Sequence, residues 1–296
     1  MVLKFTSWSR DGALNNNSSD PILVDLTLVK NATEIGAVCL DGSPPGYHFL
    51  KGYDSGTDNW LIYLEGGGWC HDVASCNARK YTNLGSSNRM ERQVPFTGIL
   101  SNLPSNNPDF FNWNIVVIRY CDGASFSGDV EETNQDVEKR FPNCISQMDA
   151  TKCFFPEEII KGLSTPVFVL NSAYDSEQIQ TMLVPSSSDP SNSWANCKLD
   201  IKKCNSNQMK VLQGFRATLL DNINDVKQKK DWGIFINSCF VHCQSWRNIL
   251  WHGPNYQRIN NKTTAESVGD WYFDRREVKE IDCPYPCNPT CVNDGS

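Results

Sequence analysis

The chain has 296 residues, of which 40% are hydrophobic and 21% are charged, and its formal net charge is −7. This length suits one large domain or two small ones. The acidic balance, without a basic stripe, argues against a nucleic-acid partner. No apolar run approaches the ~18 residues of a membrane span, so we expect no membrane partner either.

Thirteen cysteines are the strongest compositional feature of the chain. Disulfides persist in oxidising compartments, so this content predicts a secreted protein with disulfide bonds. Four potential N-glycosylation sequons, which begin at Asn16, Asn17, Asn31 and Asn261, favour the same interpretation. An odd number of cysteines leaves at least one thiol without a partner inside the chain. Residues 1–20 show no basic region followed by an apolar stretch, so no signal peptide is visible.

In chain order, we expect an unstructured N-terminal segment over residues 1–23 and a single domain over residues 24–296. Within that domain, four short apolar runs are rich in β-branched or aromatic residues, and each is followed by a polar or glycine-rich turn. Such runs predict buried strands. They are Trp60–Leu64, Ile115–Tyr120, Pro166–Leu170 and Trp232–Ile236.

The strongest helix pattern is Gln208–Gln228, where apolar residues recur every three to four positions. Strands separated by long connections predict an α/β architecture with a largely parallel sheet. Between the second and third strands, Asp129–Arg140 has no apolar stripe, which is typical of a solvated loop or a polar helix. The proline-rich tail Cys283–Cys291 predicts an extended segment held by disulfides.

The segment Glu65–Cys70 (EGGGWC) follows the first predicted strand directly. Three glycines after a strand let the backbone turn sharply and present several N–H groups on one side. In esterases, such a loop donates hydrogen bonds to the oxyanion of the tetrahedral intermediate. The alternative interpretation is a tight turn that binds nothing.

Two further polar residues follow predicted strands. Asp175 comes just after the third strand, and His242 comes just after the fourth. This is the order in which the last two members of a Ser-Asp-His triad occur in α/β-hydrolases. The aspartate would orient the imidazole, and the histidine would act as general base and then as general acid. A turn aspartate and a structural histidine remain the alternatives.

Several longer motifs make the interpretation more specific. The chain resembles the plant pectin acetylesterase family and, more distantly, the Notum carboxylesterases, and the resemblance covers nearly all of residues 24–291. The motifs include GAVCLDGSPPGYHF (Gly36–Phe49), LEGGGWC (Leu64–Cys70), RYCDGASFSG (Arg119–Gly128) and NSCFVHCQSW (Asn237–Trp246).

The resemblance implies an α/β-hydrolase-like fold and hydrolysis of acetyl esters on cell-wall pectin, with release of acetate. It places the orienting acid at Asp175 and the general base at His242. It also places part of the oxyanion hole at the backbone N–H groups around Gly67, Gly68 and Trp69. The same resemblance implies an extracellular, cell-wall location.

By similarity to Notum, the resemblance also pairs Cys39 with Cys121 and Cys70 with Cys76. Three tryptophans could stack on sugar rings, with plain core packing as the alternative for each. These tryptophans are Trp69, Trp246 and Trp251.

The chain departs from the family at the nucleophile. The family carries its catalytic serine in a Gly-x-Ser-x-Gly elbow, and this sequence contains no such pattern. The elbow would lie between Gly128 and Ser146, but a strand, elbow and helix need roughly 30 or more residues. We therefore expect an incomplete sheet that lacks its central strand and helix, with the segment missing near residues 129–145. Such a chain, the product of a truncated isoform or gene model, would be impaired or inactive as an esterase.

Three alternatives stay open. Ser125, Ser127 or a cysteine beside His242 could replace the serine, although the two serines belong to a loop that the family keeps in addition to its elbow. A non-catalytic protein that binds pectin is the second alternative. The third is a cysteine-rich metal protein built on the spacing within Cys283–Cys291 and on that of Cys239 and Cys243, and these spacings suit zinc poorly. We expect no metal or other cofactor, acetylated pectin as the partner, and a monomer if the chain folds.

Overall fold

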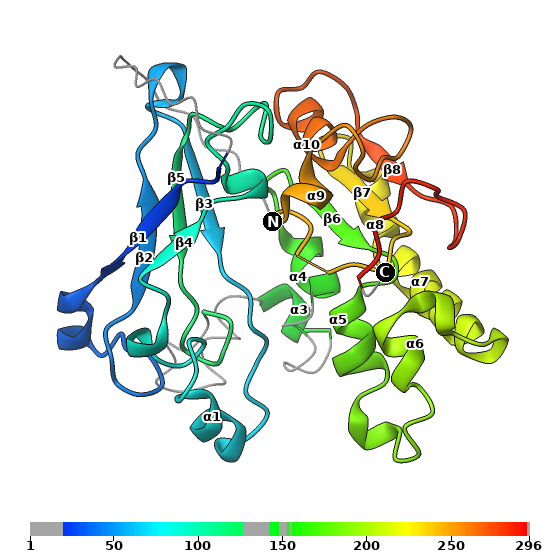
Figure 1. Ribbon diagram of the computed structural model, residues 1–296, viewed down its shortest axis with the longest axis horizontal. Helices are drawn as coiled ribbons and strands as arrows, with labels where there is room; N and C mark the ends of the chain where they lie inside the picture. The colour runs from blue at the N-terminus through cyan, green and yellow to red at the C-terminus, as the bar shows by residue number, and fades with distance from the viewer. Residues whose placement is uncertain (1–19, 127–141, 148–152, 154–155, 295–296) are drawn as a thin grey trace. The chain divides into compact units, whose positions relative to one another are not determined.

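The computed structural model describes residues 20–126, 142–147, 153 and 156–294. Contacts divide the chain into two compact units, and each is described by itself (Figure 1). The β1–β5 unit contains the described residues of Phe5–Phe96 and Asn112–Cys153. The β6–β8 unit contains those of Thr97–Phe111 and Phe154–Ser296.

Two sequence predictions fall largely or wholly outside the described residues. These are the unstructured N-terminal segment, of which the structure describes residues from 20 onward, and the loop or polar helix at Asp129–Arg140. The first described strand begins at Leu23. The single domain over residues 24–296 stays a prediction.

The strands of the two units are short. They are β1 (Leu23–Leu28), β2 (Gly46–Leu50), β3 (Trp60–Leu64), β4 (Gln93–Pro95), β5 (Asn114–Ile118), β6 (Phe168–Ser172), β7 (Gly233–Asn237) and β8 (Lys279–Ile281). The α-helices are α1 (Val73–Arg79), α3 (Pro142–Ile145), α4 (Pro156–Gly162), α5 (Ser176–Gln178), α6 (Ala195–Leu199), α7 (Ser206–Asn222), α8 (Asn224–Gln228), α9 (Asn248–Trp251) and α10 (Thr264–Tyr272).

The β1–β5 unit is built on a five-stranded sheet in the order β3-β5-β2-β1-β4. The pair β3 and β5 is parallel, whereas the other pairs in this sheet are antiparallel. β3 has the predicted bounds. β5 begins one residue earlier than the predicted strand Ile115–Tyr120, and it also ends two residues earlier than that strand. The antiparallel half of the sheet was not predicted. β3 is a terminal strand, so among the described residues it pairs on one side with β5.

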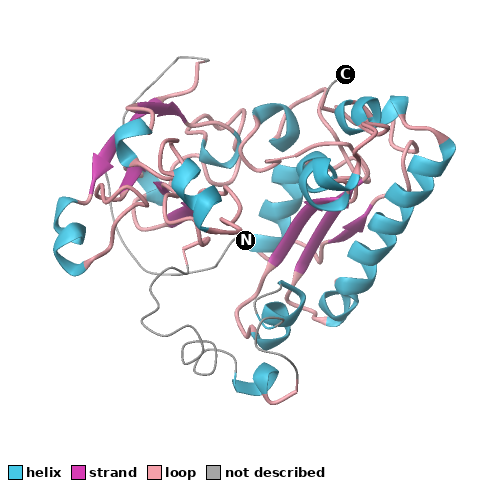
Figure 2. Ribbon diagram, turned by 90° about the horizontal axis from the view of Figure 1, so that it is seen from below, coloured by secondary structure: helices cyan, strands magenta, loops and turns pink. Residues whose placement is uncertain are grey.

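The β6–β8 unit is built on a parallel sheet in the order β6-β7-β8. β6 begins two residues later than predicted and β7 one residue later. The central strand β7 is buried at every residue. Helices lie on both sides of these strands (Figure 2).

Both faces of this parallel sheet are packed. On one face, Leu212 of α7 shares a buried core with Ile234 and Ile236 of β7. On the other, the ring centroid of Trp271 in α10 lies 5.3 Å from that of Phe168 in β6. Parallel strands covered on both faces read as continuous apolar runs rather than alternating ones, which explains why these strands could be predicted.

The long predicted helix is confirmed in part. α7 begins earlier than expected because the Asn205 side chain accepts from the Gln208 N–H and the Gln208 side chain accepts from the Asn205 N–H. This reciprocal capping satisfies two N–H groups that a helix start leaves unpaired. The helix then breaks at Ile223, and α8 continues to Gln228.

All 13 cysteines lie within the described residues, and twelve of them form six disulfides. The pairs Cys39–Cys121 and Cys70–Cys76 are confirmed. Cys243 keeps a free, exposed thiol, as the odd count requires. Among the described helices, none is long and apolar enough to cross a membrane.

Candidate active site

The β6–β8 unit brings together the two predicted acid–base residues. The Nδ1 atom of His242 lies 2.9 Å from one carboxylate oxygen of Asp175 and 3.1 Å from the other. The aspartate side chain is 7% exposed, whereas that of the histidine is 44% exposed. A buried carboxylate therefore holds one edge of an imidazole that remains open to solvent.

Parallel pairing of β6 and β7 explains why the two residues meet. Ser172 and Asn237, the last residues of these strands, are aligned in register. Beyond them, the Ser172 hydroxyl donates to the Cys239 carbonyl, and the Ser176 N–H donates to the Val241 carbonyl at 3.4 Å. The chain segments that follow the two strands therefore stay side by side. The predicted site lies at the carboxyl ends of the strands, where ligands bind in open α/β sheets.

Asp175 is held on its own side by the turn that it begins. It is the N-cap of α5, and its Oδ1 atom accepts from the Gln178 N–H at 2.9 Å. One oxygen is thus shared between the helix cap and the imidazole, which leaves the carboxylate little freedom to rotate. Such a carboxylate fixes both the orientation and the tautomer of the histidine.

The charge of His242 follows from its neighbours. Hydrogen bonding to Asp175 and then to the Cys243 side chain raises the pKa of His242 to about 10, although burial acts in the opposite direction. The carboxylate therefore stabilises the protonated ring, which is the form that a triad histidine adopts after it has taken a proton.

Asp294, which the sequence analysis missed, binds both His242 and the residue that follows Asp175. The Oδ2 atom of Asp294 accepts from the backbone N–H of His242 and from the side-chain hydroxyl of Ser176, each at 2.9 Å. Its Oδ1 atom binds Arg247 at 2.5 Å. Burial would raise the pKa of Asp294, but the hydrogen bonds from Arg247, His242 and Ser176 outweigh it and lower that pKa.

Asp294 reaches the site because of a distant disulfide. Cys239 and Cys291 are 52 residues apart, and their bond ties the C-terminal tail to the segment after β7. Two hydrogen bonds then extend the link. The Asp294 N–H donates to the Phe240 carbonyl at 2.7 Å, and the Phe240 N–H donates to the Asn293 side-chain oxygen at the same distance. Only the pairing of these two cysteines would have revealed the clamp from sequence.

The predicted oxyanion loop lies in the β1–β5 unit, directly after β3. Arg79 of α1 donates to the Gly67 carbonyl at 2.7 Å and to the Gly68 carbonyl at 2.9 Å. The Tyr120 hydroxyl also donates to the Gly68 carbonyl, at 2.5 Å. Because the C=O and N–H of a trans peptide point in opposite directions, the N–H groups of Gly68 and Trp69 point away from Arg79.

Two glycines in this loop are required by its shape. A Cβ atom at Gly67 would lie 2.4 Å from the Tyr120 ring, which is too close for any side chain. Gly68 has a φ of +65°, a conformation that glycine adopts at no steric cost. The loop is further held by the Cys70–Cys76 disulfide.

An ion-pair network around the buried Arg119 supports the start of the same loop. Arg119 binds Glu65 and Glu91, each at 2.8 Å, and its own side chain is 2% exposed. The same Glu65 oxygen also accepts from the Tyr120 N–H at 2.9 Å. The loop therefore begins from a fixed carboxylate. The loop belongs to the β1–β5 unit and the Asp175–His242 pair to the β6–β8 unit.

The three tryptophans have different environments. Trp251 is 1% exposed and its indole N–H donates to Asn107 at 3.4 Å, so the core interpretation holds and stacking on a sugar is wrong for this residue. Trp246 is partly buried. Trp69 is 51% exposed beside the glycine loop.

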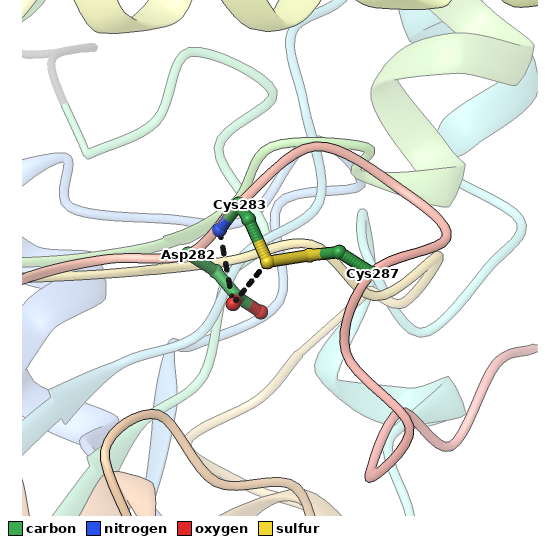
Figure 3. Close-up of side chains that lie close together, drawn as sticks. All are labelled: Asp282, Cys283 and Cys287. Atoms are coloured by element: carbon green, nitrogen blue, oxygen red, sulfur yellow. Dashed lines mark hydrogen bonds between the residues drawn. A yellow bond between two sulfur atoms is a disulfide. The ribbon is translucent and has the colours of Figure 1, made fainter.

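The cysteines of the alternative metal site within Cys283–Cys291 all form disulfides. Cys283 and Cys287 form a disulfide, and Asp282 accepts from the Cys283 N–H at 3.0 Å (Figure 3). Cys291 is bonded to Cys239. Sulfur in a disulfide cannot supply the thiolate that zinc binds, so the metal alternative loses its ligands.

Comparison with known proteins identifies the family of this chain. The Pectinacetylesterase family model matches residues 17–142 and 132–292. The chain belongs to the pectin acetylesterase family. The matches form two pieces that overlap at residues 132–142, so the family pattern is interrupted there.

Alignments with relatives in the family contain positions that this chain does not fill. The chain is 43% identical to pectin acetylesterase 5 of Arabidopsis thaliana in an alignment of 364 residues, which covers 92% of this chain and 85% of the relative. Because 92% of 296 residues is about 272, about 90 positions of that alignment have no counterpart in this chain. A shorter match, 39% identical over 100 residues, joins 33% of the chain to 20% of the palmitoleoyl-protein carboxylesterase notum1a of Danio rerio.

The fold is α/β-hydrolase-like, as predicted. The structure of the Wnt deacylase Notum from Drosophila superimposes with a TM-score of 0.70 at 17% sequence identity. The superposition covers 92% of this chain and 100% of that chain. Membership of this family supports a carbohydrate esterase function.

Proposed function

We propose that this chain is a pectin acetylesterase that keeps the acid–base half of its site and lacks the nucleophile, so that it hydrolyses the acetyl esters of pectin poorly or not at all. The observation that carries the proposal is the Asp175–His242 pair at 2.9 Å in a sequence without Gly-x-Ser-x-Gly. The relatives are named pectin acetylesterases, which supports acetylated pectin as the substrate class. An extracellular, cell-wall location is proposed with it, on the basis of the six disulfides and the family.

The missing chemistry is covalent. In a complete triad, a serine attacks the acetyl carbonyl, the imidazole takes the serine proton, and the oxyanion hole stabilises the tetrahedral intermediate. Removal of the serine leaves only the small effect of the oxyanion hole and of substrate binding.

The location and size of the interruption support a lost elbow. The two family matches overlap at residues 132–142, inside the interval where the sequence analysis places the missing segment. About 90 aligned positions of the Arabidopsis relative named above have no counterpart here. A strand–helix–strand unit needs roughly 30 or more residues, so this difference is large enough to hold the nucleophile elbow.

Acetate release tests the proposal. Acetylated pectin and p-nitrophenyl acetate are incubated with the chain, with His242→Ala and with Cys243→Ser, after far-UV circular dichroism has shown that all three are folded. We expect all three at the rate of the uncatalysed reaction. Acetate release by the unchanged chain that disappears in His242→Ala would contradict the proposal. If the same activity also disappears in Cys243→Ser, the Cys243 thiol is the nucleophile.

A second candidate function is pectin binding without hydrolysis. It is favoured by Trp69, which is 51% exposed beside a loop that Arg79 and a disulfide hold in place. An exposed indole on a rigid loop suits stacking against a sugar ring. Binding of acetylated oligogalacturonate, measured by calorimetry, should weaken in Trp69→Ala and persist in His242→Ala. Equal binding by the chain and by Trp69→Ala would count against this function.

A further inference from the structure

Three buried amide side chains form a hydrogen-bonded network that begins at the end of β7. Asn237, the last residue of β7, donates from its Nδ2 atom to the Oε1 atom of Gln244. The same Gln244 oxygen accepts from the Nε2 atom of Gln257 at 3.3 Å. The exposed fractions of Asn237, Gln244 and Gln257 are 1%, 6% and 1%. We call these three side chains the amide network.

The direction of each hydrogen bond in the amide network is fixed at both ends. At one end, the backbone N–H of Cys239 can only donate, and it donates to the Oδ1 atom of Asn237 at 3.0 Å. At the other end, the Leu250 carbonyl can only accept, and it accepts from the Nε2 atom of Gln257 at 3.4 Å. The Gln244 atom that lies between the two NH₂ groups therefore has to be its oxygen. Without this acceptor, two buried donors would be unpaired, which costs free energy.

The amide network closes the loop that carries His242. Asn237 and Gln244 flank Ser238–Cys243, and their side-chain hydrogen bond joins the two ends of this loop. Gln257 extends the link to the next two helices. Its Nε2 atom donates to the Thr264 hydroxyl of α10 at 3.4 Å, as it does to the Leu250 carbonyl of α9. The loop is therefore tied to β7 and to both helices by buried side chains.

The loop contains a backbone conformation that needs such support. Cys243, which lies between His242 and Gln244, has a φ of +46°, in the left-handed region that residues other than glycine rarely adopt. Such residues persist only where the surrounding contacts hold them, and they are concentrated at functional sites. Loss of the Gln244 hydrogen bonds would let this turn relax, and the His242 ring would then shift relative to Asp175.

We propose that Gln244 is a positioning residue that holds the His242 ring against Asp175 by closing the loop with Asn237. The inference rests on the acid–base role that the proposed function gives to His242, but it concerns the position of the ring and not the nucleophile. Its test does not depend on acetate release. A failure of the proposed function and a failure of this inference are therefore distinguishable.

Titration of the His242 ring protons by nuclear magnetic resonance tests the proposal. Hydrogen bonds with Asp175 and then with the Cys243 side chain raise the pKa of His242. Gln244→Met keeps a side chain of similar size but removes the acceptor. The pKa of His242 should then fall by about one unit or more, because the ring moves away from the Asp175 carboxylate. Gln244→Glu keeps an acceptor oxygen and should leave the pKa of His242 at or above that of the unchanged chain.

Gln208→Met is the matched control. Gln208 is a glutamine of the same unit that is 7% exposed, and its side chain accepts from the Asn205 N–H and donates to the Ser193 carbonyl at the start of α7. Its replacement should lower stability but leave the pKa of His242 unchanged. An unchanged pKa in Gln244→Met would overturn the proposal, and so would an equal fall in Gln208→Met.

A second variant keeps the proposal testable if Gln244→Met fails to fold. Gln244→Asn retains the amide but withdraws it by one CH₂ group from Asn237 and Gln257. The pKa of His242 should fall in this variant as well. If Gln244→Asn titrates as the unchanged chain does, Gln244 does not position His242 and the proposal is wrong.

Discussion

The strands β7 and β3 carry the same kind of sequence and have opposite environments. Both are short apolar runs in parallel pairs, and both were predicted as buried strands. β7 is buried at every residue, between α7 and α10. β3 buries Leu61 but exposes Trp60, Ile62 and Leu64.

The two strands differ in the cover that surrounds them. β7, the strand that precedes His242, is packed on both faces, as its apolar sequence predicts. Several hydrogen bonds hold the site residues that follow it. The strand before the glycine loop lacks this cover on one face. Loss of one strand–elbow–helix segment would account both for the bare face and for the missing nucleophile.

The largest effect is expected for matched isoleucines in the two strands. Ile236 of β7 is 1% exposed, so Ile236→Ala should lower the free energy of unfolding by about 2–5 kcal/mol. Ile62 of β3 is 55% exposed, so Ile62→Ala should cost less than about 1 kcal/mol in dilute protein. Urea unfolding measures both. Equal losses would mean that the Ile62 side chain of β3 is buried after all.

The glycine loop after β3 offers a second matched pair. A Cβ at Gly67 would meet the Tyr120 ring at 2.4 Å, whereas one at Gly66 would meet nothing within 4 Å. Gly67→Ala should therefore cost about 1–3 kcal/mol through overpacking, and Gly66→Ala close to nothing. Thermal unfolding of the two variants decides this. If Gly66→Ala were the more damaging, the described loop conformation would be wrong.

The segment after β7 depends on Asp294. Asp294→Ala leaves the His242 N–H and the Ser176 hydroxyl without their acceptor, and should lower the free energy of unfolding by about 1–2 kcal/mol. Asp294→Asn keeps an acceptor oxygen and should cost less. Nuclear magnetic resonance of the His242 ring protons should show a shift in the alanine variant. An unchanged spectrum would remove Asp294 from the positioning of the site.

The smallest effect is a pH dependence of stability. His242 has a pKa of about 10 in the folded protein, above the ordinary value of 6.5, so protonation favours folding. The stabilisation is complete below about pH 6.5, declines as pH rises, and is lost above about pH 10. The side chain is 44% exposed, so we expect a contribution below about 1 kcal/mol. The difference in stability between the chain and His242→Ala should follow this trend, and a difference that grows with pH would contradict it.

Local sequence was sufficient for the parallel strands and for the Asp175–His242 pair, because buried parallel strands are continuous apolar runs and the site follows their ends. It was insufficient where distant residues decide the structure. β8 has three residues and forms only by pairing with β7, and the antiparallel strand β1 is fixed by β2 and β4. Asp294 reaches His242 through a disulfide between residues 52 positions apart.

The most direct test of the missing nucleophile is acetate release from acetylated pectin by this chain and by a version that carries the corresponding internal segment of the Arabidopsis relative between residues 128 and 146. We expect the chain as it stands to release acetate at the background rate, and the longer version to be active in a manner that requires His242. If the chain as it stands is as active as the longer version, and His242→Ala abolishes that activity, the missing segment is not the seat of the nucleophile and the proposed loss of function is wrong.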